Sequence, residues 1–181
     1  MVKSTGYKIV KTAVLISGTG SNLKSLIKFS KTNRSPISID LIVSSNPKAK
    51  GLKYGKIFKI RKKIFNFEQI NQSESKILAT LKRYDIKMVL LAGFMKILSK
   101  NFITKFKGKI LNIHPSLLPK YKGLNTHKRA LKNKEKYSGC TVHFVNSKLD
   151  SGKIILQKRV KISKNETEKS LTKKSKNSKI G

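Results

Sequence analysis

Strand-like apolar runs alternate with segments of helical spacing along most of this sequence. The run 87–92 is almost entirely apolar, as expected of a central strand in a parallel sheet, which is buried on both faces. Residues 71–84 before it and 99–106 after it carry apolar side chains at helical spacing. Repetition of this unit predicts an α/β fold with a three-layer, mostly parallel, Rossmann-like sheet.

The same patterns place the other elements. Strands are expected at 7–17, 37–44, 109–114, 139–145 and 153–162, with a short one inside 57–67. Helices are expected at 23–30, 48–56 and 127–134, and one begins after a cap at Ser99. The last two strands follow one another through a short turn, so we expect them to form an antiparallel pair.

Length and composition favour one domain in a reducing compartment. The chain has 181 residues, which suits a single domain. We expect this domain over 1–174, with 175–181 as an atypical tail that looks truncated. No apolar run reaches 18 residues and the start lacks a signal peptide pattern. The single cysteine, Cys140, excludes an internal disulfide. We therefore expect a cytoplasmic protein that does not bind membranes.

The charge of the chain is extreme, with 42 Lys and Arg against 8 Asp and Glu, formally +34. Nucleic-acid binding is the first explanation to test. Proteins that read bases favour arginine and stacking aromatic residues, whereas the basic residues here are mostly lysine and are spread along the chain. We therefore expect no specific nucleic acid and a preference for small anionic ligands, while the reason for the charge stays open.

A glycine turn follows the first expected strand. Residues Gly18 to Asn22 read GTGSN and lead into a helix. Unpaired N–H groups and the dipole at such a helix start attract anions. The segment does not match the G-x-G-x-x-G motif of dinucleotide-binding proteins, because the third glycine would fall at Leu23. It does not match a Walker A loop either, because no Gly-Lys-Ser/Thr sequence closes the turn. The segment is therefore either a phosphate site or a plain tight turn.

Three polar residues suggest acyl-transfer chemistry. Asn112 and His114 are separated by two positions on an expected strand, so they share a face at its carboxyl end, where open α/β sheets bind ligands. Asp150 follows in a turn between two strands. A base, a carboxylate that tunes it and a neutral donor for an oxyanion form a minimal site. Each residue alone also has an ordinary structural explanation.

The three histidines do not predict a metal site. His114, His127 and His143 have no cysteine partner nearby and few carboxylates, and their spacing matches no common ligand pattern. His143 is expected either to support the site from its strand or simply to lie in the core. We expect no metal.

Four stretches of the sequence point together to a known family. They are Ser17–Leu23, Leu91–Leu98, Leu111–Gly123, and Val142–Phe144 with Leu149–Gly152. In this order they resemble the phosphoribosylglycinamide formyltransferases, over roughly residues 9–162. The third stretch is specific to folate-dependent formyltransferases, and the first narrows the choice to the purine-pathway enzymes.

The resemblance implies the formyltransferase fold and an activity. A formyl group would pass from 10-formyltetrahydrofolate, a co-substrate, to the amine of glycinamide ribonucleotide in de novo purine biosynthesis. No metal would be required, and the enzyme would be a monomer or weak homodimer. The implied catalytic residues are Asn112, His114 and Asp150. The implied ribonucleotide-binding residues are Gly18, Thr19, Gly20, Ser21 and Asn22. The implied folate-binding residues are Met95, Lys96, Ile97 and Leu98, with Asn112.

Two places depart from the family pattern. Where the family often has an arginine that contacts the folate, this sequence has Ile70 beside Gln69 and Gln72, so no folate contact is assigned there. Residues 166–174 begin like the family's late helix, but 175–181 lack its apolar spacing and its Glu-His pair. We expect this end to lower both stability and ribonucleotide affinity relative to the family.

Other functions stay open at this point. Formyltetrahydrofolate deformylase and methionyl-tRNA formyltransferase share the Asn-His-Asp trio, but the first carries an extra N-terminal domain and the second an extra C-terminal one. Neither fits 181 residues. A basic RNA-associated protein on the same scaffold is the alternative from another class, and the salt dependence of RNA binding would test it.

Overall fold

The computed structural model describes residues 8–177. The chain divides into two compact units, one ending at Lys109 and the other beginning at Ile110. The single domain expected over 1–174 stays a prediction. None of the helices within the described range is long and apolar enough to cross a membrane.

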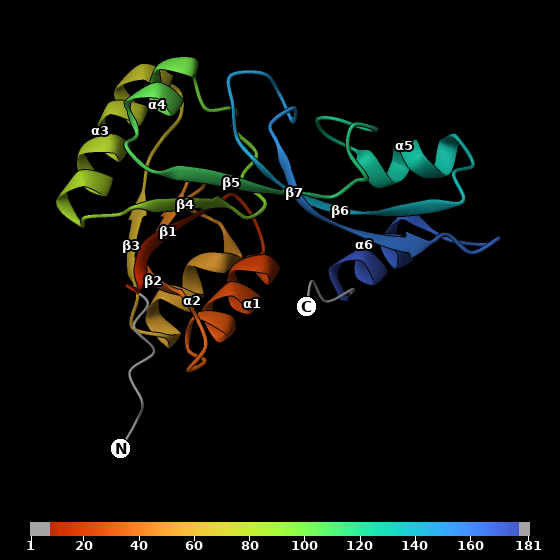
Figure 1. The fold of residues 1–181 in the computed structure, drawn as a ribbon, viewed down its shortest axis with the longest axis horizontal. Helices are drawn as coiled ribbons and strands as arrows, with labels where there is room; N and C mark the ends of the chain where they lie inside the picture. The colour runs from red at the N-terminus through yellow and green to blue at the C-terminus, as the bar shows by residue number, and fades with distance from the viewer. Residues whose placement is uncertain (1–7, 178–181) are drawn as a thin grey trace. The chain divides into compact units, whose positions relative to one another are not determined.

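The first unit is built on parallel strands in the order β3-β2-β1-β4. The strands are β1 (Val10–Ile16), β2 (Ile37–Ser44), β3 (Arg61–Ile64) and β4 (Met88–Leu91). Helices α1 and α2 lie on one face of these strands, and α3 and α4 lie on the other (Figure 1). The helices are α1 (Ser21–Ser30), α2 (Lys53–Ile57), α3 (Ile70–Arg83) and α4 (Lys100–Lys105). The three layers expected from the sequence are therefore present in this unit.

Burial explains this arrangement. Residues 13–16 of β1 are fully buried, because they are covered from both faces, as the continuous apolar run predicts. The β3 strand is exposed at all its positions, and its Arg-Lys-Lys sequence suits a sheet edge, where charge discourages pairing with other chains. The helix expected at 48–56 is a 3-10 turn, η1 (Lys50–Leu52), followed by α2.

The second unit contains antiparallel strands. β5 (Lys109–His114), which begins at the last residue of the first unit, pairs with β6 (Tyr137–Phe144), and β6 pairs with β7 (Ile154–Lys161), both antiparallel. Helices α5 (Thr126–Lys132) and α6 (Glu168–Asn177) contact β6 and each other. The expected antiparallel pair of C-terminal strands, and with it the α/β class, is confirmed.

The C-terminal helix continues past the expected boundary at 174. α6 reaches Asn177, and its Leu171 is fully buried. Residues 178–181 of the expected tail lie outside the described residues. The lower stability and affinity expected from this tail stay predictions.

Candidate active site

Strand β5 carries two of the three expected catalytic side chains. Asn112 and His114 lie at its carboxyl end and pair across to His143 and Thr141 of β6. The two-residue repeat of a strand directs both side chains to one face, as the sequence predicts. His114 is only 4% exposed, so its ring nitrogens must find partners within the protein.

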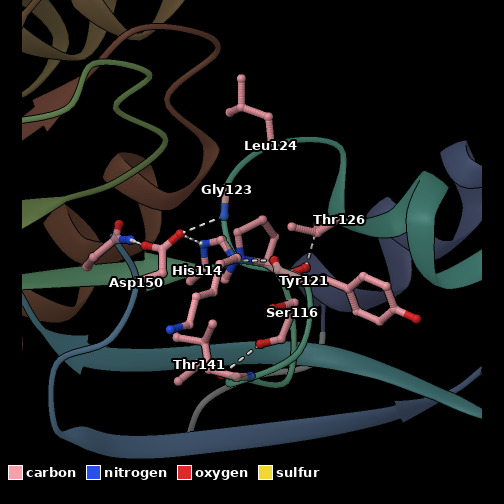
Figure 2. Close-up of polar contacts among 12 residues, drawn as sticks. His114, Ser116, Tyr121, Gly123, Leu124, Thr126, Thr141 and Asp150 are labelled. Carbon is pink, nitrogen blue, oxygen red and sulfur yellow. Dashed lines mark hydrogen bonds and ion pairs between the residues drawn. The ribbon is translucent and has the colours of Figure 1, made fainter. Parts of the chain in front are cut away.

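Asp150 reaches these side chains from the turn between β6 and β7. Its Oδ2 lies 3.3 Å from Nδ1 of His114, and its Oδ1 accepts a hydrogen bond of 3.2 Å from Nδ2 of Asn112. Figure 2 shows Asp150 facing both His114 and the backbone nitrogen of Gly123, which donates to Oδ2 over 2.9 Å. The three residues that the sequence singled out, 38 positions apart at most, therefore converge.

The turn that carries Asp150 needs a glycine two residues later. A Cβ at Gly152 would lie 1.8 Å from the carbonyl oxygen of Phe144, a distance at which two atoms cannot coexist. Asp150 itself has φ 44°, in the left-handed region that Asp and Asn tolerate better than most residues. The Asp-Ser-Gly sequence thus permits a tight turn that aims the carboxylate at β5.

Asp150 is a carboxylate at neutral pH. Burial alone would raise the pKa of Asp150, but hydrogen bonds from His143 and Gly123, with the nearby imidazoles, outweigh burial and lower its pKa to about 2. Its negative charge is therefore available to stabilise a neighbouring cation.

Both ring nitrogens of His114 face oxygen acceptors. Nε2 lies 2.9 Å from the backbone oxygen of Tyr121, and Nδ1 faces the Asp150 carboxylate. A neutral imidazole has only one N–H and would direct a lone pair at one of these oxygens, whereas the imidazolium donates to both. The imidazolium form of His114 can therefore donate to both oxygens at once.

His143 supports the site from within the core. It is 2% exposed, and its Nδ1 lies 2.8 Å from its neighbour's oxygen on Phe144. A carbonyl only accepts, so Nδ1 carries a proton, and Nε2 lies 3.3 Å from Nδ2 of Asn112 and 3.5 Å from Oδ1 of Asp150. Of the two alternatives left open by the sequence, support of the site fits these contacts.

The site has no metal cluster among the residues that the structure describes. No group of three or more His, Cys, Asp or Glu in residues 8–177 has a geometry that could hold a metal ion. The third histidine, His127, lies on α5, with its Nδ1 3.5 Å from the hydroxyl of Ser138.

Two contributions to the site came from the backbone and were missed in the sequence. They are the Tyr121 carbonyl and the Gly123 N–H, which bind His114 and Asp150. Both residues have positive φ, 57° and 77°. Gly123 carried a weak signal because glycine favours this region, but Tyr121 carried none.

The expected ribonucleotide loop lies in the first unit, between β1 and α1. Gly20 has φ 73° and precedes α1 without any side-chain cap, so N–H groups of the first turn are left for a ligand or water. A Cβ at Gly20 would lie 2.6 Å from Cα of Gly51, so only glycine fits there. The geometry suits an anion at this helix start, and the role of Gly18 to Asn22 stays a prediction.

The expected folate loop in the same unit is tied to the end of β1. The hydroxyl of Ser17 accepts a hydrogen bond from the Met95 nitrogen over 2.8 Å and lies 2.7 Å from the hydroxyl of Ser45. Met95 and Ile97 are 67% and 70% exposed, whereas Leu98 is buried. Two large apolar side chains on this loop suit contact with the flat face of an aromatic ring, and folate binding by residues 95–98 stays a prediction.

Comparison with known proteins adds to this geometry. The Formyl transferase family model matches residues 10–179. A phosphoribosylglycinamide formyltransferase from Haemophilus influenzae is 43% identical over 155 residues, which are 84% of this chain and 73% of that protein. The human trifunctional purine biosynthetic protein adenosine-3 is 42% identical over 163 residues, 88% of this chain, but the chain spans only 16% of that protein. The solved structure of glycinamide ribonucleotide transformylase 1 from Symbiobacterium toebii has a TM-score of 0.90 at 31% identity, covering 97% of this chain and 84% of the other.

Proposed function

This chain belongs to the phosphoribosylglycinamide formyltransferase family of de novo purine biosynthesis, and we propose that it moves a formyl group from 10-formyltetrahydrofolate to the amine of glycinamide ribonucleotide. The observation that carries the proposal is the convergence of Asn112 and His114 on Asp150, which lies 3.2 Å from the first and 3.3 Å from the second. An amide donor, a buried imidazole and an ionised carboxylate are the groups that formyl transfer between two amines requires.

The reaction forms one C–N bond and breaks another. The ribonucleotide amine attacks the formyl carbon, and its electron pair forms the new bond while the carbonyl oxygen becomes an oxyanion. The oxyanion then collapses, the bond from carbon to the folate nitrogen breaks, and that nitrogen receives the proton that the attacking amine loses. The protein's task is to stabilise the oxyanion and to guide this proton.

Asn112 is the hydrogen-bond donor for the oxyanion. Its Nδ2 contacts are long, 3.2 Å to Asp150 and 3.3 Å to His143. A developing negative oxygen is a strong acceptor, so it draws an Asn112 N–H away from these long contacts as charge develops. Loss of one such donor typically costs ~10²–10³ in rate.

His114 supplies positive charge. Its imidazolium, held between Asp150 and the Tyr121 carbonyl, stabilises the oxyanion from a fixed position within a site that excludes most water. Asp150 keeps the ring charged and oriented. The carboxylate also faces N–H groups on both oxygens, so it stays ionised through the reaction.

The proposal also assigns substrate binding to the two loops of the first unit, and it needs no metal. The start of α1 at Gly18 to Asn22 binds the ribonucleotide phosphate and ribose, and Met95 to Leu98 contact the folate. The reaction needs no Lewis acid, because the amide and the imidazolium supply the charge that the oxyanion requires. The enzyme acts in the cytoplasm. One chain contributes all three catalytic side chains, so a monomer or weak homodimer suffices for the reaction.

A formyl-transfer assay with both substrates tests the proposal. The wild type should formylate glycinamide ribonucleotide, and Asn112→Ala and His114→Ala should each lose ~10²-fold or more in kcat. Omission of the ribonucleotide distinguishes transfer from hydrolysis of the folate, the reaction of a deformylase. Dialysis against EDTA should leave the rate unchanged. Full activity in His114→Ala would remove this residue from the mechanism.

A further inference from the structure

The carbonyl that holds His114 belongs to a residue in an unusual conformation. Tyr121 accepts from Nε2 of His114 through its backbone oxygen, and its φ of 57° lies in the left-handed region. Residues with a side chain other than Asn, Asp or His seldom occupy this region. Since the conformation is unfavourable by itself, contacts elsewhere on Tyr121 must hold it.

The Tyr121 side chain provides these contacts on the side away from the imidazole. Figure 2 shows the Tyr121 ring pointing away from His114 while the carbonyl faces it. The ring hydroxyl donates to Oε1 of Glu135 over 2.8 Å, and Asn133 donates to this hydroxyl over 3.0 Å. The guanidinium of Arg129 lies 5.2 Å from the ring centre.

Glu135 is the centre of this anchor. Its Oε1 accepts both the Tyr121 hydroxyl and the Lys120 ammonium, the latter over 2.9 Å. Hydrogen bonds from Lys120 and Tyr121 lower the pKa of Glu135, so the acceptor is ionised at neutral pH. One carboxylate thus restrains two successive residues of the loop that leads to the catalytic imidazole.

We propose that Glu135 is a positioning residue for His114, acting through the Tyr121 hydroxyl, ring and backbone carbonyl. The contacts of the Glu135 carboxylate are with Lys120 and Tyr121, so it acts on the reaction only through this loop. Its carboxylate fixes the ring, the ring fixes the left-handed backbone, and the backbone oxygen orients the imidazolium. The inference rests on the proposed function, because it assigns Glu135 to the same reaction.

Glu135 also borders open space. Lys120, Tyr121, Glu135 and Arg159 line a cavity of about 590 Å³ in the second unit. Removal of the Glu135 side chain would leave room there for a small carboxylate beside Lys120 and the Tyr121 hydroxyl. Acetate or formate can therefore replace the missing group, which gives the proposal a readout that a purely structural role would not produce.

The test compares Glu135→Ala with the wild type in the formyl-transfer assay. Because the imidazole loses its fixed orientation, kcat should fall by roughly 10-fold to 100-fold, while KM for both substrates stays close to the wild-type value. Added acetate should restore kcat of the variant in a saturable way and leave the wild type unchanged. The melting temperature should change little, because the ion pair with Lys120, whose side chain is 64% exposed, contributes little to stability.

Two further variants complete the design. Tyr121→Phe removes only the hydroxyl and should lower kcat as Glu135→Ala does, without rescue by acetate. The double variant should lose no more than the larger single effect, because both changes break one bond. Glu166→Ala removes a carboxylate paired with Lys174 at 3.0 Å and is the matched control; its kcat should equal that of the wild type, with or without acetate.

The outcomes separate the two proposals. An inactive wild type overturns the proposed function and this inference with it. An active wild type whose kcat survives in both Glu135→Ala and Tyr121→Phe overturns the inference alone. If Glu135→Ala fails to fold, Tyr121→Phe decides. A loss of kcat that acetate does not restore, and that matches the loss of melting temperature, also overturns it.

Discussion

The Asp150 carboxylate and the His114 imidazole form a nearly buried pair that is ionic when the ring is protonated, with Oδ2 3.3 Å from Nδ1 and side chains only 8% and 5% exposed. Little water reaches this pair, so its charges interact more strongly than they would at the surface. A buried pair is costly to separate once formed, because removal of one partner leaves the other charge uncompensated. The effects of breaking it should therefore be large and measurable.

Replacement of Asp150 by asparagine keeps the size of the side chain and removes its charge. We expect kcat to fall by roughly 10²-fold or more. The asparagine amide carries no negative charge to stabilise the imidazolium, and only one of its two terminal atoms can accept a hydrogen bond. KM for both substrates should change much less. Steady-state kinetics with each substrate varied in turn checks this, and a variant with wild-type kcat would contradict the role of Asp150.

The same carboxylate should make the free energy of unfolding depend on pH in the acid range. The pKa of Asp150 is lowered from 3.8 to about 2 in the folded protein, so its contribution is present above pH 3.8 and is lost as pH falls through about 2. The shift corresponds to roughly 2 kcal/mol. Chemical unfolding between pH 2 and 6 (roughly the range in which carboxylates titrate) measures it.

Asp150→Asn should flatten only part of that acid dependence. Glu166 has its pKa lowered to about 2 as well, by hydrogen bonds from Ser170 and Lys174, and it acts with the same sign. A curve for Asp150→Asn that runs parallel to the wild-type curve would show that Asp150 has an ordinary pKa.

The spacing of apolar residues along the sequence predicted much of the fold. The boundaries of β2 and β5 matched the expected 37–44 and 109–114, because each strand is an apolar run bounded by residues that interrupt regular structure. The 3-10 turn at 50–52 was expected as part of a helix, since a single turn of either kind presents almost the same pattern.

The site was predictable only in part. The spacing of apolar residues predicts which neighbouring side chains share a face, but it does not predict contacts between residues far apart in the sequence. The shared face of Asn112 and His114 follows from their spacing. Their chemistry suggested that Asp150 belongs to the same site, but its contacts with both depend on the β6–β7 turn, which the spacing does not determine. The Tyr121 carbonyl carries no side-chain signature, so its hydrogen bond to His114 could not be anticipated.

The glycine behind Asp150 should be essential. In Gly152→Ala the new Cβ would meet the Phe144 oxygen at 1.8 Å, so the turn must move and take the carboxylate with it. We expect a loss of roughly 1–3 kcal/mol in unfolding free energy and a fall in kcat. Gly108→Ala is the matched control, because its Cβ would meet the Lys87 oxygen at 2.3 Å; it should lose stability while the folded fraction keeps its kcat.

The hydroxyl of Ser17 should matter for folate binding and not for the chemical step. It accepts the Met95 N–H over 2.8 Å, so Ser17→Ala leaves this nitrogen without its acceptor and loosens the loop that bears Met95 and Ile97. A lost acceptor of this kind costs about 1–2 kcal/mol, which corresponds to a rise in KM for the folate of roughly 5-fold to 30-fold. Ser45→Ala removes the neighbour of Ser17 but keeps the bond to Met95, so its KM should stay close to the wild-type value. Equal folate KM in the two variants would contradict the role of Ser17, and a fall in kcat alone would place Ser17 in the chemical step instead.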